Sequence, residues 1–321
     1  MLRRVSITAA IAALAASLAC AADEYPVRAV RVVVPFAPGG GTDVVGRILA
    51  QQLSQRLGQS FVIENKPAGS GIVGADFVAK AQGDGYTLLF AFSSLSSSEK
   101  LISHLPYDPV ADFAPVALAT TSPLVMFLHP SVPATNLREF IAYAKANPGK
   151  LNYGSSGPGS SPHLATELLM SMAGIQMTHI PYKGIAPAIT AQLANEVQVS
   201  LTPIAVGMSH ARAGKLRALA QAGMKRSAAI PDVPTIDESG LPGFEVIGWW
   251  GMLAPSKTPR PVVVLLNREV RAALESPDVK KSLLDQGMDP AGGSPEEFGA
   301  LIRADMDKWG DVGKRLGVKL D

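Results

Sequence analysis

Two turns rich in glycine and serine carry the residue types best suited to binding a small anion. The first turn is Phe36-Ala37-Pro38-Gly39-Gly40-Gly41-Thr42-Asp43, and the second is Gly154-Ser155-Ser156-Gly157-Pro158-Gly159-Ser160-Ser161. Glycine leaves main-chain N–H groups uncovered, and a helix that begins at such a turn adds partial positive charge from its dipole. An anion can therefore bind at either turn without a lysine or an arginine.

The elements that must position these turns alternate between strand-like and helical patterns. We expect strands at 30–34, 61–64, 87–92 and 116–119, with helices over 43–57 and 72–81 between the first three. This order predicts a parallel sheet with ligand-binding turns at the carboxyl ends of its strands.

A second set of elements begins with a strand at 124–128. In this set, Ser161 and Pro162 fit the N-cap and N1 positions of a helix that runs to about 172. A strand at 246–253 then leads the chain back toward the first set. Two chain crossings, near 122 and 245, therefore predict two hinged lobes with a ligand between them.

The N-terminal 22 residues have the pattern of an export signal. Arg3 and Arg4 precede an apolar stretch over 5–18 and a small-residue cleavage site, which predicts cleavage near Ala21 or Ala22. A lipoprotein signal ending at Cys20 is the alternative interpretation. Cleavage after Ala21 would leave 300 residues without cysteine, because Cys20 is the only cysteine. Disulfides, thiol catalysis and cysteine-ligated zinc would then be excluded.

The charge balance argues against partners that are themselves strongly charged. Without Arg3 and Arg4, the Lys and Arg count falls from 29 to 27, which equals the 27 Asp and Glu residues. A mature chain of zero net charge has no basic field for nucleic acid or an anionic membrane. Anion binding must then come from local geometry.

Ordered short segments along the whole mature chain point to one protein family. They include Val33-Val34-Pro35-Phe36 with Gly39-Gly40-Gly41-Thr42-Asp43, Glu64-Asn65-Lys66-Pro67, Asp84-Gly85-Tyr86-Thr87, Leu105-Pro106-Tyr107-Asp108-Pro109, Pro148-Gly149-Lys150-Leu151-Asn152-Tyr153, His179-Ile180-Pro181-Tyr182-Lys183-Gly184 and Pro231-Asp232-Val233-Pro234-Thr235. Together they resemble the substrate-binding receptors of tripartite tricarboxylate transporters, the Bug or TctC-like proteins of the bacterial periplasm.

The resemblance implies an α/β fold of the type II-like periplasmic-binding-protein kind, with parallel-rich sheets flanked by helices and a cleft between two lobes. Lobe 1 would comprise 23–122 and 247–321, and lobe 2 would comprise 123–246. Such a receptor is a periplasmic monomer that hands a small organic carboxylate to the permease subunits of its transporter. It is not an enzyme, and it needs no cofactor and no metal.

The resemblance also implies which residues face the ligand, with backbone groups and ordered water from the two turns holding its carboxylate. From the first lobe these are Phe36, Gly39, Gly40, Gly41, Thr42, Asp43, Ser93 and Ser94, and from the second Gly154, Ser155, Ser156, Ser160, Ser161, His163, Tyr182, Lys183, Gly184 and Thr202. A side chain at Gly40 or Gly41 would block the ligand, and a β-branched one would also resist a left-handed backbone. We expect Asp43 to cap its helix rather than touch an anion.

One departure from the family pattern bears on the ligand. Where many relatives carry Phe-Asp-Asn, this chain has Leu201-Thr202-Pro203. The change removes a carboxylate that could receive a ligand ammonium group, so an acid without an amine is favoured over an amino acid.

Two other functions have some support in the sequence. Gly69-Ser70-Gly71-Ile72-Val73-Gly74 matches a dinucleotide-binding fingerprint, but it follows the second strand and fits a tight turn with close helix packing. The serine-rich turns with His163 or His179 as base would suit an exported serine hydrolase acting on a small ester or amide. No Gly-x-Ser-x-Gly elbow supports that alternative.

Overall fold

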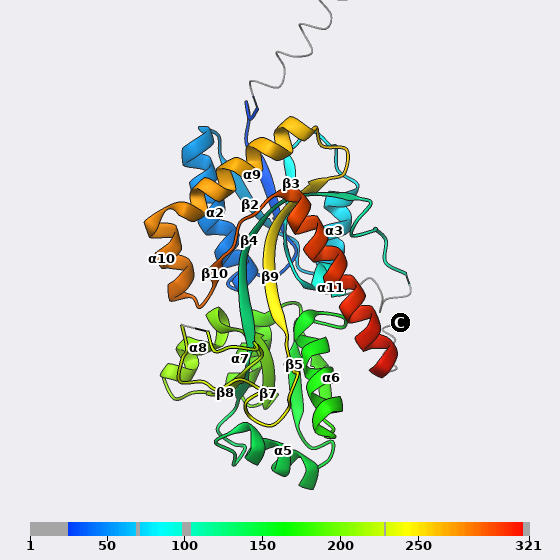
Figure 1. The fold of residues 1–321 in the computed structure, drawn as a ribbon, viewed down its shortest axis with the longest axis vertical. Helices are drawn as coiled ribbons and strands as arrows, with labels where there is room; N and C mark the ends of the chain where they lie inside the picture. Colours follow the sequence, from blue (N-terminus) through cyan, green and yellow to red (C-terminus); the bar gives the residue numbers. More distant parts are fainter. Residues whose placement is uncertain (1–24, 69–70, 98–103, 228, 317–321) are drawn as a thin grey trace, which may run out of the picture.

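The computed structural model describes residues 25–316 except 69–70, 98–103 and 228. The predicted signal peptide and its cleavage site therefore lie outside the described residues. Figure 1 shows two lobes, one above the other, with two long strands running through both. Within the described part of the chain, no helix is both long enough and apolar enough to span a membrane.

Lobe 1, the upper lobe in Figure 1, is built on three parallel strands. β1 (Val30–Val34) lies between β2 (Phe61–Asn65) and β3 (Thr87–Phe92) and pairs in parallel with both. Helices α2 (Gly41–Leu57) and α3 (Ile72–Ala79) form the crossovers, which confirms the predicted order of strands and helices. The remaining helices of this lobe are α4 (Ser94–Ser97), α9 (Arg260–Glu275), α10 (Pro277–Asp285) and α11 (Pro295–Leu316).

Lobe 2 repeats the same principle with shorter elements. β5 (Asn152–Ser155) pairs in parallel with β6 (Thr178–Pro181) and with β7 (Val199–Pro203), while β8 (Arg217–Gln221) pairs with the strand that enters from lobe 1. The helices are α5 (Leu137–Ala146), α6 (Ser161–Ala173), α7 (Ile185–Leu193) and α8 (Ile204–Arg212). The α/β class and the two-lobed architecture are thus confirmed.

The two lobes are joined by continuous antiparallel strands, β4 (Phe113–Leu128) and β9 (Ile247–Pro255). The prediction of separate strands at 116–119 and 124–128 is wrong, because both belong to β4. This strand pairs with β9 over 113–123 and with β7 and β8 over 124–128, and β10 (Asp289–Pro290) pairs with it at 120–121. The lobe boundaries at 122 and 246 stay a prediction.

Packing of α2 on the sheet fixes where the first turn lies. Val45, Leu49 and Leu53 are fully buried on one face of α2, as the apolar spacing predicts, and they join the core with β1. The turn between β1 and α2 therefore lies at the carboxyl end of β1, where parallel sheets hold their ligands.

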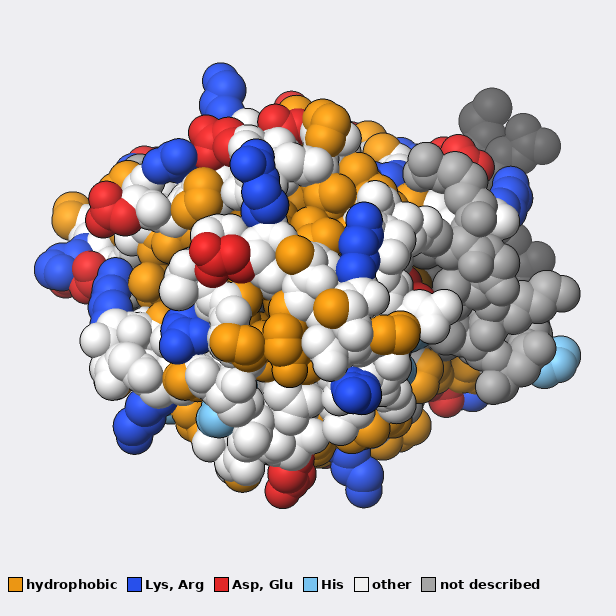
Figure 2. Space-filling view, turned by 90° about the horizontal axis from the view of Figure 1, so that it is seen from below, with side chains coloured by type: hydrophobic (Ala, Val, Ile, Leu, Met, Phe, Trp, Pro, Cys, Tyr) orange, Lys and Arg blue, Asp and Glu red, His pale blue; other side chains and the backbone are white. Residues whose placement is uncertain are grey.

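Charges of both signs are interspersed on the face seen from below in Figure 2, with apolar side chains between them. The full chain has a formal net charge of +2. Binding of an anion therefore has to be explained by the local geometry of a site.

Candidate ligand-binding site

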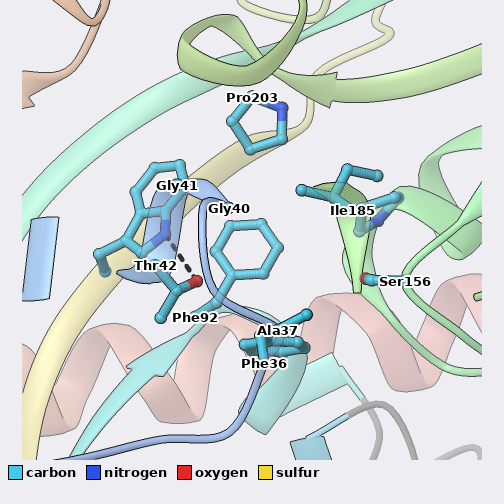
Figure 3. Close-up of a pocket in the computed structure, with 11 residues that line it drawn as sticks. Phe36, Ala37, Gly40, Gly41, Thr42, Phe92, Ser156, Ile185 and Pro203 are labelled. Carbon is cyan, nitrogen blue, oxygen red and sulfur yellow. Dashed lines mark hydrogen bonds between the residues drawn. The ribbon is translucent and has the colours of Figure 1, made fainter. Parts of the chain in front are cut away.

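A pocket lies where the two lobes meet, at the start of α2 (Figure 3). It encloses about 350 Å³ of empty space, part of it open to solvent. Lobe 1 contributes Phe36, Ala37, Gly40, Gly41, Thr42, Phe92 and Trp250, and lobe 2 contributes Ser156, Pro162, Ile185 and Pro203. None of these lining residues has an ionisable side chain, so the pocket is uncharged.

The first turn presents the N-terminus of α2 to this pocket. Gly40 is the N-cap, with φ −78° and ψ 165°, and no side chain caps the helix there. The N–H groups of the first helical turn, at Gly41 and Thr42, have no intrahelical partner by the geometry of the α-helix. The left-handed backbone expected at Gly40 or Gly41 lies instead at Gly39, with φ 83°. Gly40 is thus open because it lacks a side chain, and its backbone conformation suits any residue.

Asp43 holds the first turn together. Its carboxylate accepts hydrogen bonds from the Gly39 N–H at 3.0 Å, from Arg47 Nε at 2.9 Å and from Asn65 Nδ2 at 2.9 Å. Burial raises the pKa of the Asp43 carboxyl, but the hydrogen bonds from Arg47, Gly39 and Asn65 outweigh it and hold the pKa below its usual value. The side chain supports the turn and lies outside the pocket lining. The backbone N–H that it binds belongs to Gly39, before the N-cap, so Asp43 does not form the helix cap that we expected.

Aromatic rings form one wall of the pocket. The centroids of Phe92 and Trp250 are 4.8 Å apart, and those of Phe36 and Phe92 are 6.5 Å apart. Trp250 Nε1 donates to Thr42 Oγ1 at 3.1 Å, shown as the dashed line in Figure 3. An indole N–H can only donate, so the Thr42 hydroxyl keeps its own proton available to donate. Trp249 instead lies in a separate core cluster against Phe298.

The second turn contributes one hydroxyl to the pocket, that of Ser156. This residue is 3% exposed, and its Oγ has no hydrogen-bond partner among the described residues. The Ser160 hydroxyl accepts from the His163 N–H at 3.4 Å and is the N-cap of α6, one residue before the predicted N-cap at Ser161. A buried hydroxyl left without a partner is costly, so a ligand that accepts from Ser156 would gain from it.

Stacked aromatic and imidazole rings support the second turn from behind. The ring centroids of His163 and His179 are 4.2 Å apart, and Tyr153 lies 4.8 Å from His179. Burial lowers the pKa of His163 to about 3, with help from the neighbouring His179, and burial alone lowers the pKa of His179 to about 4. Both imidazoles are therefore neutral at neutral pH, and neither supplies a charge to an anion.

Four of the described helices begin at the pocket. The lining includes the first residues of α2 (Gly41), the N-terminal Pro162 of α6, the first residue of α7 (Ile185) and the N-cap of α8 (Pro203). Because each helix N-terminus carries partial positive charge, their convergence favours an anion without any basic side chain.

Direct contacts join the lobes around the pocket. A Cβ built on Gly184, the N-cap of α7, would lie 3.3 Å from the Ala37 nitrogen, and one on Gly40 would lie 3.6 Å from Ile185 Cγ2. Ser93 Oγ and Ser161 Oγ are 2.8 Å apart. The lobes are thus in contact on more than one side of the pocket.

The structure brings part of the predicted set together. Of the predicted residues, Phe36, Gly40, Gly41, Thr42 and Ser156 line the pocket. The others lie outside its lining, namely Gly39, Asp43, Ser93, Ser94, Gly154, Ser155, Ser160, Ser161, His163, Tyr182, Lys183, Gly184 and Thr202. Lys183 is exposed, and the buried Thr202 hydroxyl donates to the Pro203 carbonyl.

Sequence reasoning missed the apolar half of the lining. Ala37, Phe92, Pro162, Ile185, Pro203 and Trp250 line the pocket but were not predicted to. Except for Trp250, each of these residues is next to a predicted site residue in the sequence. The available signal for Trp250 was its place beside Trp249, because neighbouring residues on a strand point to opposite faces of the sheet.

The contacts of two motifs bear on the alternative functions. A Cβ on Gly74 would lie 2.7 Å from Pro35 Cβ, so this glycine serves close helix packing, while Gly69 and Ser70 lie outside the described residues. Ser155 Oγ lies 2.6 Å from His179 Nε2, the serine–histidine contact that a hydrolase would need. The same oxygen accepts from the Gly157 N–H at 3.0 Å, so the hydroxyl is held inside the turn and away from the pocket.

Comparison with known proteins finds relatives over almost the whole chain. The chain is 37% identical to Protein BugT of Bordetella pertussis, in an alignment covering 100% of this chain and 98% of that protein. A structure of Rpa4515 from R. palustris with adipate is 36% identical and has a TM-score of 0.89, covering 92% of this chain and 99% of that one. MatC from Rhodopseudomonas palustris with bound malate is 36% identical with a TM-score of 0.86, over 90% and 99% of the two chains.

The family model described as "Tripartite tricarboxylate transporter family receptor" matches residues 45–318. This match includes α2 from residue 45 onward, both joining strands and the second turn. The resemblance seen in the sequence is therefore confirmed, and the chain belongs to the TctC family of tripartite tricarboxylate transporter receptors.

Proposed function

We propose that this protein is a periplasmic receptor that captures a small organic carboxylate and delivers it to the permease of a tripartite tricarboxylate transporter. The observation that carries the proposal is the uncharged pocket between the lobes. Its lining includes both the uncapped start of α2 and the Ser156 hydroxyl, which has no partner among the described residues. A carboxylate supplies the acceptors that both groups lack.

The ligands of two relatives support this assignment of chemistry. Adipate and malate are both small carboxylates, and they are bound by proteins about one-third identical to this chain. We further propose that Phe36, Gly40, Gly41, Thr42 and Ser156 contact the ligand. The predicted residues outside the lining, such as His163 and Gly184, would act by shaping the turns around it.

Titration calorimetry on the chain without its first 21 residues tests the binding step. The panel pairs each small carboxylate with its primary amide, which has nearly the same shape and no charge. We expect at least one acid to bind and its amide to bind at least tenfold more weakly. An amide that binds as well as its acid, or an ester or amide that is hydrolysed, would overturn the receptor assignment.

Delivery and export call for measurements in cells. Loss of the receptor should abolish uptake of the acid that it binds, and the protein should be released with the periplasmic fraction. Uptake that continues unchanged without the receptor would contradict a role in transport. On gel filtration with light scattering, we expect a monomer.

A further inference from the structure

We infer that the ligand carries a single carboxylate head and an apolar tail, such as an aromatic ring or an alkyl chain. The inference rests on the proposed function, since it names the class of carboxylate that the same pocket accepts. It follows from the lining of the pocket, which is mostly apolar, has few hydrogen-bond donors and includes no charged side chain.

Few hydrogen-bond donors line the pocket. The main-chain N–H groups at the start of α2 come from lobe 1, and the Ser156 hydroxyl comes from lobe 2. Ser156 is 97% buried and its hydroxyl has no partner among the described residues. The hydroxyl can therefore donate a hydrogen bond to a ligand. These groups suit the two oxygens of one carboxylate held between the lobes.

Apolar groups occupy the rest of the wall (Figure 3). The Phe92 and Trp250 rings lie side by side, and the Ile185 side chain faces the turn at Gly40, with its Cγ2 3.6 Å from where a Cβ there would be. A second carboxylate placed against the Phe92 and Ile185 side chains would lose its hydration without gaining a hydrogen bond from them, which is strongly unfavourable. An apolar ring or chain would gain from the same contacts.

Proline removes a main-chain donor at two positions of the lobe 2 lining. Pro162 stands at the N-terminus of α6 and Pro203 is the N-cap of α8, and both line the pocket. Proline has no main-chain N–H, so these positions present rings where other residues would present donors. The neighbouring Thr202 hydroxyl donates a hydrogen bond to the Pro203 carbonyl oxygen, with 3.2 Å between the two oxygens.

Titration calorimetry with matched pairs of acids tests the inference directly. Hexanoate is paired with adipate, and 4-methylbenzoate with benzene-1,4-dicarboxylate, so that a methyl group replaces the second carboxylate at the same position. We expect the monocarboxylate to bind at least tenfold more tightly in at least one pair and the dicarboxylate to be favoured in neither. A dicarboxylate that binds as tightly as its partner in both pairs, or more tightly in either, overturns the inference.

The outcomes separate this inference from the proposed function. If a dicarboxylate or malate is the tightest ligand, the single-head assignment is wrong while carboxylate capture stands. If none of these acids binds, both the inference and the proposed carboxylate chemistry are overturned.

A variant pair tests the apolar wall. Phe92→Leu should weaken binding of 4-methylbenzoate by about tenfold, because it removes a ring contact from the wall. The control is Phe77→Leu, a partly exposed phenylalanine outside the pocket lining, which should leave the affinity unchanged. Equal affinities for Phe92→Leu and the unmodified protein would overturn the placement of the tail.

Discussion

Ser93 Oγ and Ser161 Oγ lie 2.8 Å apart, so one hydrogen bond joins the end of β3 in lobe 1 to the first residue of α6 in lobe 2. Both side chains are buried. Their neighbours in sequence, Phe92 and Pro162, line the pocket. The bond therefore ties the lobes together directly beside the proposed ligand site.

Removing this bond should loosen the contact between the lobes. We expect Ser93→Ala or Ser161→Ala to weaken ligand binding by roughly two- to tenfold, since a net hydrogen bond contributes about 0.5–1.5 kcal/mol. In a double-mutant cycle followed by titration calorimetry, the double variant should lose little more than the larger single loss. Losses that simply add would show that the two hydroxyls act independently.

Ser156→Ala should separate binding from stability. The Ser156 hydroxyl has no partner among the described residues, so its removal should leave the free energy of unfolding unchanged or slightly higher. Ligand affinity should fall by roughly tenfold or more, since a hydrogen bond to a charged group contributes about 1.5–3 kcal/mol. Thermal unfolding and calorimetry measure the two quantities.

The matched control for that variant is Ser160→Ala, four residues further on. Ser160 caps α6, and losing an N-cap side chain costs about 0.5–2 kcal/mol of stability. If Ser156→Ala destabilised the protein as much as Ser160→Ala and left affinity unchanged, Ser156 would be a structural residue.

The histidine stack should make folding sensitive to mild acid. The unfolded chain takes up protons on these imidazoles near their ordinary pKa of 6.5, whereas folded His163 and His179 do so only near 3 and 4. The unfolded state therefore binds more protons in this window, and the free energy of unfolding falls as the pH drops from about 6.5 toward 4.

Denaturant titrations at pH 7 and pH 5 measure this effect before most carboxylates titrate. The double variant H163Q/H179Q should show a smaller loss of stability between the two pH values. An equal loss in the variant would mean that other groups cause the acid sensitivity. At pH 7 the variant should be less stable than the unmodified protein, because the ring stack with Tyr153 is gone.

Local patterns in the sequence predicted the helices and strands well where an element packs against the same neighbours along its whole length. The apolar spacing of α2 and the parallel strands of lobe 1 are examples. The pattern failed for β4, which we expected to be two strands at 116–119 and 124–128. Pro123 is tolerated there because the strand changes partners at that point, from β9 to β7 and β8.

One part of the candidate site could likewise be predicted from local sequence, and another part could not. The glycine and serine turns could be read locally, because bare N–H groups and hydroxyls before a helix are visible in the chain itself. The apolar walls could not, because Phe92, Ile185, Pro203 and Trp250 come from four separate segments that only the tertiary fold brings together. The conformation of Gly40 was also beyond local reasoning, since a run of three glycines does not reveal which one has a positive φ.

The central claim is that the start of α2 holds a carboxylate, and the affinity of Gly40→Val for the tightest-binding acid tests it most directly. Valine can adopt the extended backbone of Gly40, so folding should survive with a loss of about 1 kcal/mol for a poorer N-cap. Its side chain would project toward Ile185 and cover the N–H groups. The loss of two charge-assisted hydrogen bonds should weaken binding roughly a hundredfold or more.

Gly58→Val, at the other end of the same helix, is the control for this measurement. Gly58 has φ 69°, so valine there should cost about 1–2 kcal/mol of stability, while the pocket stays intact. We predict that calorimetry finds the hundredfold loss for Gly40→Val and unchanged affinity for Gly58→Val. A folded Gly40→Val variant that binds the acid as tightly as the unmodified protein would contradict the claim.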